Sequence, residues 1–299
     1  MTMKPSLILN RALFFFLCGF GFYSAFSFLT LHFAREKIKV HLDANIDAIA
    51  IGHSHVECGL DDKHFPGLKN FGKSGEALYY GCLKAAKIVQ TYPQVKTVFV
   101  ELSANQMDAH MKDWICDEEH FQRAMKSYFH LLSSSAKLDF FLSFPLNYCT
   151  SHLIAEKRII GLLLGDRSKC NTNELEWGGY VAHEKNITDS LQMMKSNSSR
   201  FLQPYPPNLT AILDLIKFCG DRGVKVVLIR VPVHESETDL FELSFQDILR
   251  ENFSDLEFYD YRKMYLPDSC FLDREHLNAD GARIFADRFY QDWMRSKGN

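Results

Sequence analysis

The chain has 299 residues, with 46% hydrophobic and 24% charged side chains and a formal net charge of −3. This length is enough for one large domain with a substantial core. The slightly acidic balance supplies no basic face of the kind that binds nucleic acid, so that class of partner is excluded.

A long apolar segment at residues 12–34 follows a short N-terminal tail at residues 1–11. No side chain between Arg11 and Arg35 is charged, and as a helix the segment reaches roughly 35 Å, enough for a bilayer core of about 30 Å. It predicts a single transmembrane anchor. A cleaved signal peptide is the alternative, but it predicts a shorter apolar region and a small-x-small cleavage site. Basic residues flank both ends, so charge does not fix the orientation.

The first predicted strand, residues 46–51, ends in Gly52-His53-Ser54. A short apolar run closed by glycine is typical of a buried parallel strand that enters a tight turn. Ser54 then lies beyond the carboxyl end of the strand, where ligands bind in open α/β sheets. The alternative is that Ser54 only caps the next segment, because serine is a favoured N-cap residue.

Strands and helices alternate along the rest of the chain. We predict a strand at 67–71, a helix at 76–91, a strand at 97–102, a helix at 207–222, strands at 224–231 and near 256–259, and a closing helix from about Asn278. This alternation implies parallel strands with helices on both faces of the sheet. The sequence therefore predicts one α/β domain over residues 40–299.

The stretch from about 107 to 204 fits this scheme poorly. It contains an aromatic segment at 140–144 and a polar patch at 195–200. We interpret it as an insertion or lid rather than as a separate domain. A lid over Ser54 would select the acceptor, whereas surface packing is the alternative role for such a segment.

A second polar motif, Asp273-Arg274-Glu275-His276, precedes the closing helix. A serine hydroxyl needs an imidazole to take its proton, and the imidazole needs a carboxylate to fix its tautomer. Their spacing lets Asp273 reach one nitrogen of His276 and leaves the other for a serine. Ser54, His276 and Asp273 therefore predict a catalytic triad, although a lone Asp-x-x-His is more often a surface ion pair.

Four sequence blocks resemble, in the same order, those of the SGNH (GDSL-like) hydrolase superfamily. They are Gly52-His53-Ser54, Asn70-Phe71-Gly72-Lys73-Ser74-Gly75, Glu101-Leu102-Ser103-Ala104-Asn105-Gln106 and Asp273-Arg274-Glu275-His276-Leu277. The resemblance implies a flavodoxin-like three-layer α/β sandwich with a mainly parallel sheet, here preceded by the transmembrane helix.

The same resemblance implies a role for each matching residue. Ser54 is the nucleophile, His276 the base and Asp273 its partner. The backbone N–H groups of Ser54 and Gly75, with the side-chain amide of Asn105, form the oxyanion hole. Donors of this kind stabilise the negative charge that acyl transfer builds on one oxygen.

Three positions depart from the family pattern. His53 stands where many members carry aspartate, Ser103 replaces a glycine, and Gln106 replaces an aspartate. Membrane-anchored envelope-modifying members, such as D-alanyl-transfer (DltD-like) and alginate O-acetylation proteins, tolerate such variation. Similarity to these members implies a single-pass protein of the cell membrane, with its catalytic domain on the extracytoplasmic (periplasmic) side.

Histidines near the predicted strand ends are candidates for substrate contact, namely His53, His55 and His234. His53 and His55 alternate across an extended chain, so we do not expect both to point at Ser54. Neither this pair nor Cys116 with His120 has a clear third and fourth ligand. We therefore predict no metal site and no cofactor.

Taken together, these features predict a membrane-anchored serine esterase or O-acyltransferase that acts on acylated cell-envelope glycans through an acyl-enzyme. The expected partners are an acylated glycan or another ester, the membrane, and envelope-assembly membrane proteins. The alternative is a catalytically silent SGNH-like module that binds glycan or acts as a scaffold in an envelope-assembly complex.

Overall fold

The computed structural model of the chain describes residues 40–129, 131–163, 177–184, 202–237 and 241–298, together with a few residues between 14 and 29. Its elements are β1 (Ala48–Ile51), α2 (Ser54–Gly59), η1 (Asp62–His64), β2 (Leu68–Asn70), α3 (Leu78–Thr91), β3 (Thr97–Glu101), α4 (Ala104–Met107), α5 (Met111–Cys116), α6 (Glu118–Tyr128), α7 (Ser134–Ser143), α8 (Pro145–Leu163), α9 (Pro206–Gly220), β4 (Lys225–Arg230), α10 (Glu242–Asn252), β5 (Phe258–Asp260), η4 (Asp268–Cys270) and α11 (Ala279–Lys297).

The centre of the molecule is a five-stranded sheet in the order β2-β1-β3-β4-β5, and all four strand pairs are parallel. This is the flavodoxin-like order, and the predicted α/β class with a parallel sheet is confirmed. The strand order reverses at β1, since β2 lies on one side of β1 and β3 lies on the other. Ligands of such sheets bind at the carboxyl ends of the strands near this reversal.

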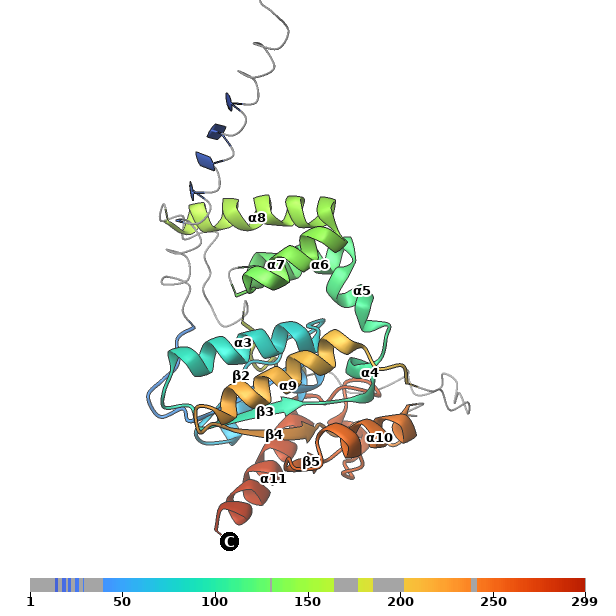
Figure 1. Cartoon of the computed structure of the whole chain (residues 1–299). Coiled ribbons are helices and arrows are strands. Elements are labelled where there is room, and N and C mark those ends of the chain that lie inside the picture. Colours follow the sequence, from blue (N-terminus) through green and yellow to red (C-terminus); the bar gives the residue numbers. More distant parts are fainter. Residues whose placement is uncertain are drawn as a thin grey trace, which may run out of the picture.

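Helices cover both faces of the sheet, which makes three layers (Figure 1). Successive residues of β1 alternate between the two cores: Ile49 and Ile51 pack towards α3 and α9, whereas Ala48 and Ala50 pack towards α11. This two-residue period is what a strand buried on both faces produces. An edge-to-face aromatic cluster dominates the core on the α11 side, with Phe65, Phe99, Phe289 and Trp293.

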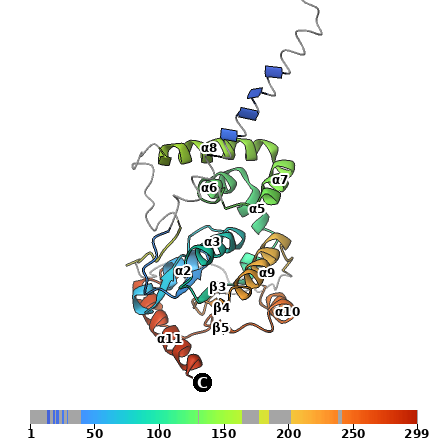
Figure 2. The same cartoon turned by 60° about the vertical axis from the view of Figure 1, so that its left-hand side comes forward.

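Helices α5 to α8 lie between β3 and β4 in sequence and beyond α3 in space, as both views show (Figures 1 and 2). Their core joins Met111, Phe121 and Phe129 to Tyr80 of α3. The two ends of the segment that contains α5 to α8 lie side by side, because Asp108 and Pro204 form an antiparallel bridge. The strands β3 and β4 are therefore neighbours in the sheet despite the long segment between them.

The prediction of a transmembrane helix at residues 12–34 is contradicted by the structure. Among the residues that the structure describes, no helix is both long and apolar enough to cross a bilayer. The two longest described helices, α8 and α11, each have 19 residues, and both carry charged side chains, Glu156 and Lys157 in the case of α8. Most of residues 12–34, and all of the tail at 1–11, lie outside the described part.

A buried ion pair ties the loop after β2 to α3. Lys84 is fully buried, and its Nζ donates to Glu76 Oε2 (2.7 Å) and to the carbonyls of Phe71 (2.6 Å) and Trp177 (2.8 Å). Burial lowers the pKa of Lys84, although Glu76 opposes the shift. Tyr128 of α6 donates to Glu76 as well. This network holds the loop that contains Gly75 against both α3 and the inserted helices.

Candidate active site

Ser54 lies at the carboxyl edge of the sheet, three residues after the last residue of β1, and is the first residue of α2. The strand must pass very close to β3 here, since a Cβ on Gly52 would lie 2.7 Å from the Cβ of Glu101. Only glycine avoids this clash. The first N–H groups of a helix have no intrahelical acceptor, so the Ser54 amide is suited to bind a negatively charged oxygen.

The loop with Asp273 and His276 is fixed to the rest of the fold at several points. Asn278 caps α11 by accepting from Gly281 N (3.1 Å), and its amide donates to the Ser269 carbonyl (2.7 Å). The backbone N–H of His234 donates to the Arg274 carbonyl (2.9 Å). A loop held in this way keeps the position of its side chains relative to the sheet edge.

The structure brings Ser54, His276 and Asp273 together. His276 Nε2 lies 2.8 Å from Ser54 Oγ, and His276 Nδ1 lies 2.9 Å from both carboxylate oxygens of Asp273. Asp273 Oδ1 also accepts from the backbone N–H groups of Glu275 (2.8 Å) and His276 (2.9 Å). These contacts place a proton on Nδ1 and leave Nε2 free to accept the serine proton.

The protonation of the triad follows from the same contacts. Burial lowers the pKa of His276, but the hydrogen bond and the charge of Asp273 outweigh it, so the pKa is raised above its usual value. Burial raises the pKa of Asp273, but hydrogen bonds from His276 and from the backbone outweigh it and lower the pKa. Asp273 is therefore an anion near neutral pH, and His276 is a stronger base than a free histidine.

The other two predicted oxyanion donors follow the two strands that neighbour β1, β2 and β3. Gly75 has φ of +70°, a left-handed conformation that favours glycine. Its loop runs beside the end of β1, because Lys73 N donates to the Gly52 carbonyl (3.0 Å). Asn105 is exposed in the short helix α4, after β3, and lines the cavity beside the triad.

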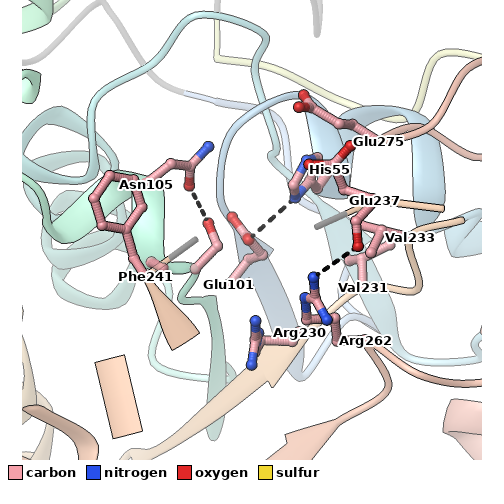
Figure 3. Close-up of a pocket in the computed structure, with 12 residues that line it drawn as sticks. His55, Glu101, Asn105, Arg230, Val231, Val233, Glu237, Phe241, Arg262 and Glu275 are labelled. Carbon is pink, nitrogen blue, oxygen red and sulfur yellow. Dashed lines mark hydrogen bonds and ion pairs between the residues drawn. The ribbon is translucent and has the colours of Figure 1, made fainter. Parts of the chain in front are cut away.

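This cavity lies between the ends of β3 and β4 and the Asp273 loop (Figure 3). Eight of its twelve lining residues have polar or charged side chains, namely His55, Glu101, Ser103, Asn105, Arg230, Glu237, Arg262 and Glu275, and the others are Ala104, Val231, Val233 and Phe241. Arg230 is held by Glu242 (2.9 Å) and Asp260 (3.2 Å), and Arg262 donates to the Glu237 carbonyl (3.2 Å). Sequence reasoning missed these arginines, since nothing in the chain marks them as near Ser54.

Glu101 is a further residue whose position the sequence did not reveal. Its carboxylate is fully buried at the end of β3, 3.6 Å from both His53 Nε2 and His55 Nδ1. Burial raises its pKa, but the two imidazoles beside it outweigh this effect and lower the pKa to about 2. The rings of His53 and His55 lie 4.3 Å apart. Our assumption of an extended chain at these two residues does not hold, because α2 begins at Ser54.

Glu101, His53 and His55 are close enough to hold a metal ion, yet their hydrogen bonds favour another arrangement. His53 Nδ1 accepts from the backbone N–H of His55 (3.3 Å). A neutral His53 then carries its proton on Nε2, the atom that faces Glu101. A metal needs a lone pair at that atom, so this tautomer does not suit one.

Of the three histidines proposed for substrate contact, His55 alone lines the cavity beside the triad. His53 is buried behind Ser54, with Nδ1 3.4 Å from Ser54 Oγ. His234 lines a neighbouring hollow, where its Nδ1 accepts from Ser236 N (3.1 Å) and its Nε2 lies 3.2 Å from Asp268. The structure thus places His234 as a support of its own loop, apart from Ser54.

Comparisons with known proteins give little beyond this geometry. A protein-family model matches residues 187–298, less than half of the chain, a range that includes Asp273 and His276 but not Ser54. Among curated proteins, none matches the sequence. A provisionally assigned acylhydrolase from Bacteroides fragilis has a similar structure, with 9% identity, a TM-score of 0.39, and coverage of 87% of this chain and 93% of its own. A similarity this loose says nothing about the activity of the present chain.

Proposed function

We propose that this protein is a serine-type esterase or O-acyltransferase with Ser54 as its nucleophile. The observation that carries the proposal is the continuous contact from Asp273 through His276 to Ser54 Oγ, with distances of 2.9 and 2.8 Å. Three side chains from the two ends of the sequence meet in the order and geometry that acyl transfer needs.

In the first half of the reaction, His276 Nε2 takes the proton of Ser54 while Oγ attacks the carbonyl carbon of an ester. The tetrahedral intermediate collapses when the C–O bond to the leaving alcohol breaks, and His276 gives its proton to that oxygen. Water or a second hydroxyl then attacks the acyl-serine by the reverse sequence. Hydrolysis and transfer share the first half and differ only in the acceptor.

Negative charge develops on the former carbonyl oxygen, and the donors for it come from separate strand ends. The Ser54 amide comes from the start of α2, the Gly75 amide from the loop after β2, and the Asn105 side chain from α4. Each such donor contributes about 3 to 4 kcal/mol to transition-state stabilisation in serine hydrolases.

The cavity beside the triad supports a polar substrate. Arginine, glutamate, asparagine and serine side chains line it, and these groups pair with hydroxyls. Phe241 supplies an apolar face on the opposite wall (Figure 3). An acylated glycan, the substrate class that the family resemblance implies, has both hydroxyls and apolar ring faces, and we propose this class.

Labelling with a fluorophosphonate tests the nucleophile directly. We expect wild-type protein to be labelled, and labelling to disappear in Ser54→Ala and in His276→Ala. His64→Ala is the matched control, since His64 pairs with Asp287 (3.2 Å) outside the triad, and it should keep full labelling. Labelling that survives in Ser54→Ala would place the reactive serine elsewhere. A folded but unlabelled wild type would favour the silent binding module.

Turnover of two acetyl esters tests the substrate class. We expect a higher kcat/KM for an O-acetylated oligosaccharide than for p-nitrophenyl acetate, although the second has the better leaving group. The cavity variant Arg262→Ala should lower kcat/KM for the oligosaccharide and leave that for p-nitrophenyl acetate nearly unchanged. Equal losses for both esters would contradict a role of the cavity in glycan binding.

A further inference from the structure

A chain of hydrogen bonds leads from the backbone of α2 to the side chain of Asn105. The backbone N–H of His55 donates to His53 Nδ1 (3.3 Å), His53 Nε2 lies 3.2 Å from Ser103 Oγ, and Ser103 Oγ lies 2.7 Å from Asn105 Oδ1. This chain of hydrogen bonds passes through His53 and Ser103, two positions at which the sequence departs from the SGNH pattern. None of its members belongs to the Ser54, His276 and Asp273 triad.

The direction of each proton in this chain is fixed by the first donor. A backbone N–H can only donate, so His53 Nδ1 must accept, and a neutral His53 carries its proton on Nε2. The ring is neutral at physiological pH because burial lowers the pKa of His53 to about 4, against the opposing effect of Glu101. His53 Nε2–H therefore donates to Ser103 Oγ, and the hydroxyl proton of Ser103 is directed to Asn105 Oδ1.

The last link decides which end of the Asn105 amide faces the cavity. The two ends of an amide have nearly the same shape and opposite hydrogen-bonding character. With Oδ1 held by Ser103, Nδ2 is turned to the other side, as Figure 3 shows. The reverse orientation would present an oxygen lone pair to a developing oxyanion and would oppose the reaction.

We propose that Ser103, itself oriented by His53, is a positioning residue that fixes the Asn105 amide with its Nδ2 donor towards the acyl oxygen. Its effect on turnover rests on the proposed function, whereas the proton arrangement does not. The two can therefore be tested separately, one by spectroscopy and one by kinetics.

The proton arrangement is tested by NMR of ¹⁵N-histidine-labelled protein, with His53 assigned by comparison with His53→Gln. We expect the Nε2–H tautomer, unchanged between pH 8 and pH 5. A Nδ1–H tautomer, or protonation near pH 6.5, would overturn the proposal whether or not the protein is an active enzyme. If the spectrum is as expected but fluorophosphonate does not label the protein, the proton arrangement is supported and the proposed esterase function is not.

A double-mutant cycle tests the effect on turnover. Asn105→Ala should lower kcat by roughly 10²- to 10³-fold, and Ser103→Ala should lower kcat about tenfold with little change in KM. In the Asn105→Ala background, Ser103→Ala should have no further effect, because it acts only through Asn105. Ser103→Thr retains the hydroxyl and should restore most of the activity.

This cycle separates positioning from structural support. Ser103 is also the N-cap residue of α4, so Ser103→Ala lowers stability for that reason alone. A merely structural role would reduce activity by the same factor with or without Asn105. Such additive losses, or a Ser103→Ala enzyme with unchanged kcat, would overturn the proposal.

Discussion

Replacing Lys84 by methionine should destabilise the fold more than any exposed ion-pair variant. Lys84 is fully buried and donates to three oxygens, those of Glu76, Phe71 and Trp177. Methionine fills a similar volume but leaves the Glu76 carboxylate without its cation and two carbonyls without their donor. Removing one partner of a buried ion pair costs about 3 to 5 kcal/mol, a large part of the stability of a typical domain.

Urea unfolding followed by circular dichroism measures this loss as a difference in the free energy of unfolding. Lys225→Met is the matched control, since Lys225 pairs with Glu257 at the surface and both side chains are nearly half exposed. It should cost about 1 kcal/mol or less. Adding Glu76→Gln to Lys84→Met should recover part of the loss, because the unpaired charge is then gone. A Lys84→Met protein as stable as Lys225→Met would refute the reasoning.

Three further predictions concern the triad loop and its surroundings. Asp273→Asn should lower kcat about 10⁴-fold by favouring the wrong tautomer of His276; a steady-state assay with less than tenfold loss would contradict this. Asp273 raises the pKa of His276, and His276 must be neutral to act as the base. We therefore expect log(kcat/KM) to fall as the pH is lowered through a pKa above 6.5. An acid limb centred below pH 6.5 in the pH–rate profile would contradict this upward shift of the His276 pKa. Asn278→Ala removes the cap of α11 and should cost about 0.5 to 2 kcal/mol, measured by urea unfolding, with the fluorophosphonate labelling rate falling as well.

The sheet could be predicted from sequence because its signals are local. The apolar run at 46–51 corresponds to β1 at Ala48–Ile51, and the run at 224–231 corresponds to β4 at Lys225–Arg230. Asp47 and Gly52 bound the first strand, Gly223 and Pro232 bound the apolar run of the second, and both strands are buried on both faces. The closing helix was also placed to within a residue, since Asn278 carries a visible capping signal.

The surroundings of Ser54 could not be predicted in the same way, because they depend on contacts between distant segments. Glu101 reads in sequence as the polar end of a strand, and only the approach of Gly52 shows that it lies behind Ser54. His53 and His55 were expected on opposite sides of an extended chain, but α2 begins at Ser54 and brings their rings together. Arg262 reaches the cavity from the loop after β5, which no local pattern reveals.

The burial of the cysteines has a practical consequence for chemical labelling. Cys58, Cys82, Cys219 and Cys270 are buried in the cores, and burial raises the pKa of each thiol. Little thiolate forms at neutral pH, so maleimides and peroxide should react with them slowly. Cys18 and Cys149 are both exposed, so a Cys18→Ser variant is needed to direct the label to Cys149 on α8. A fluorophore coupled there would report how α8 moves while the folded sheet stays unmodified.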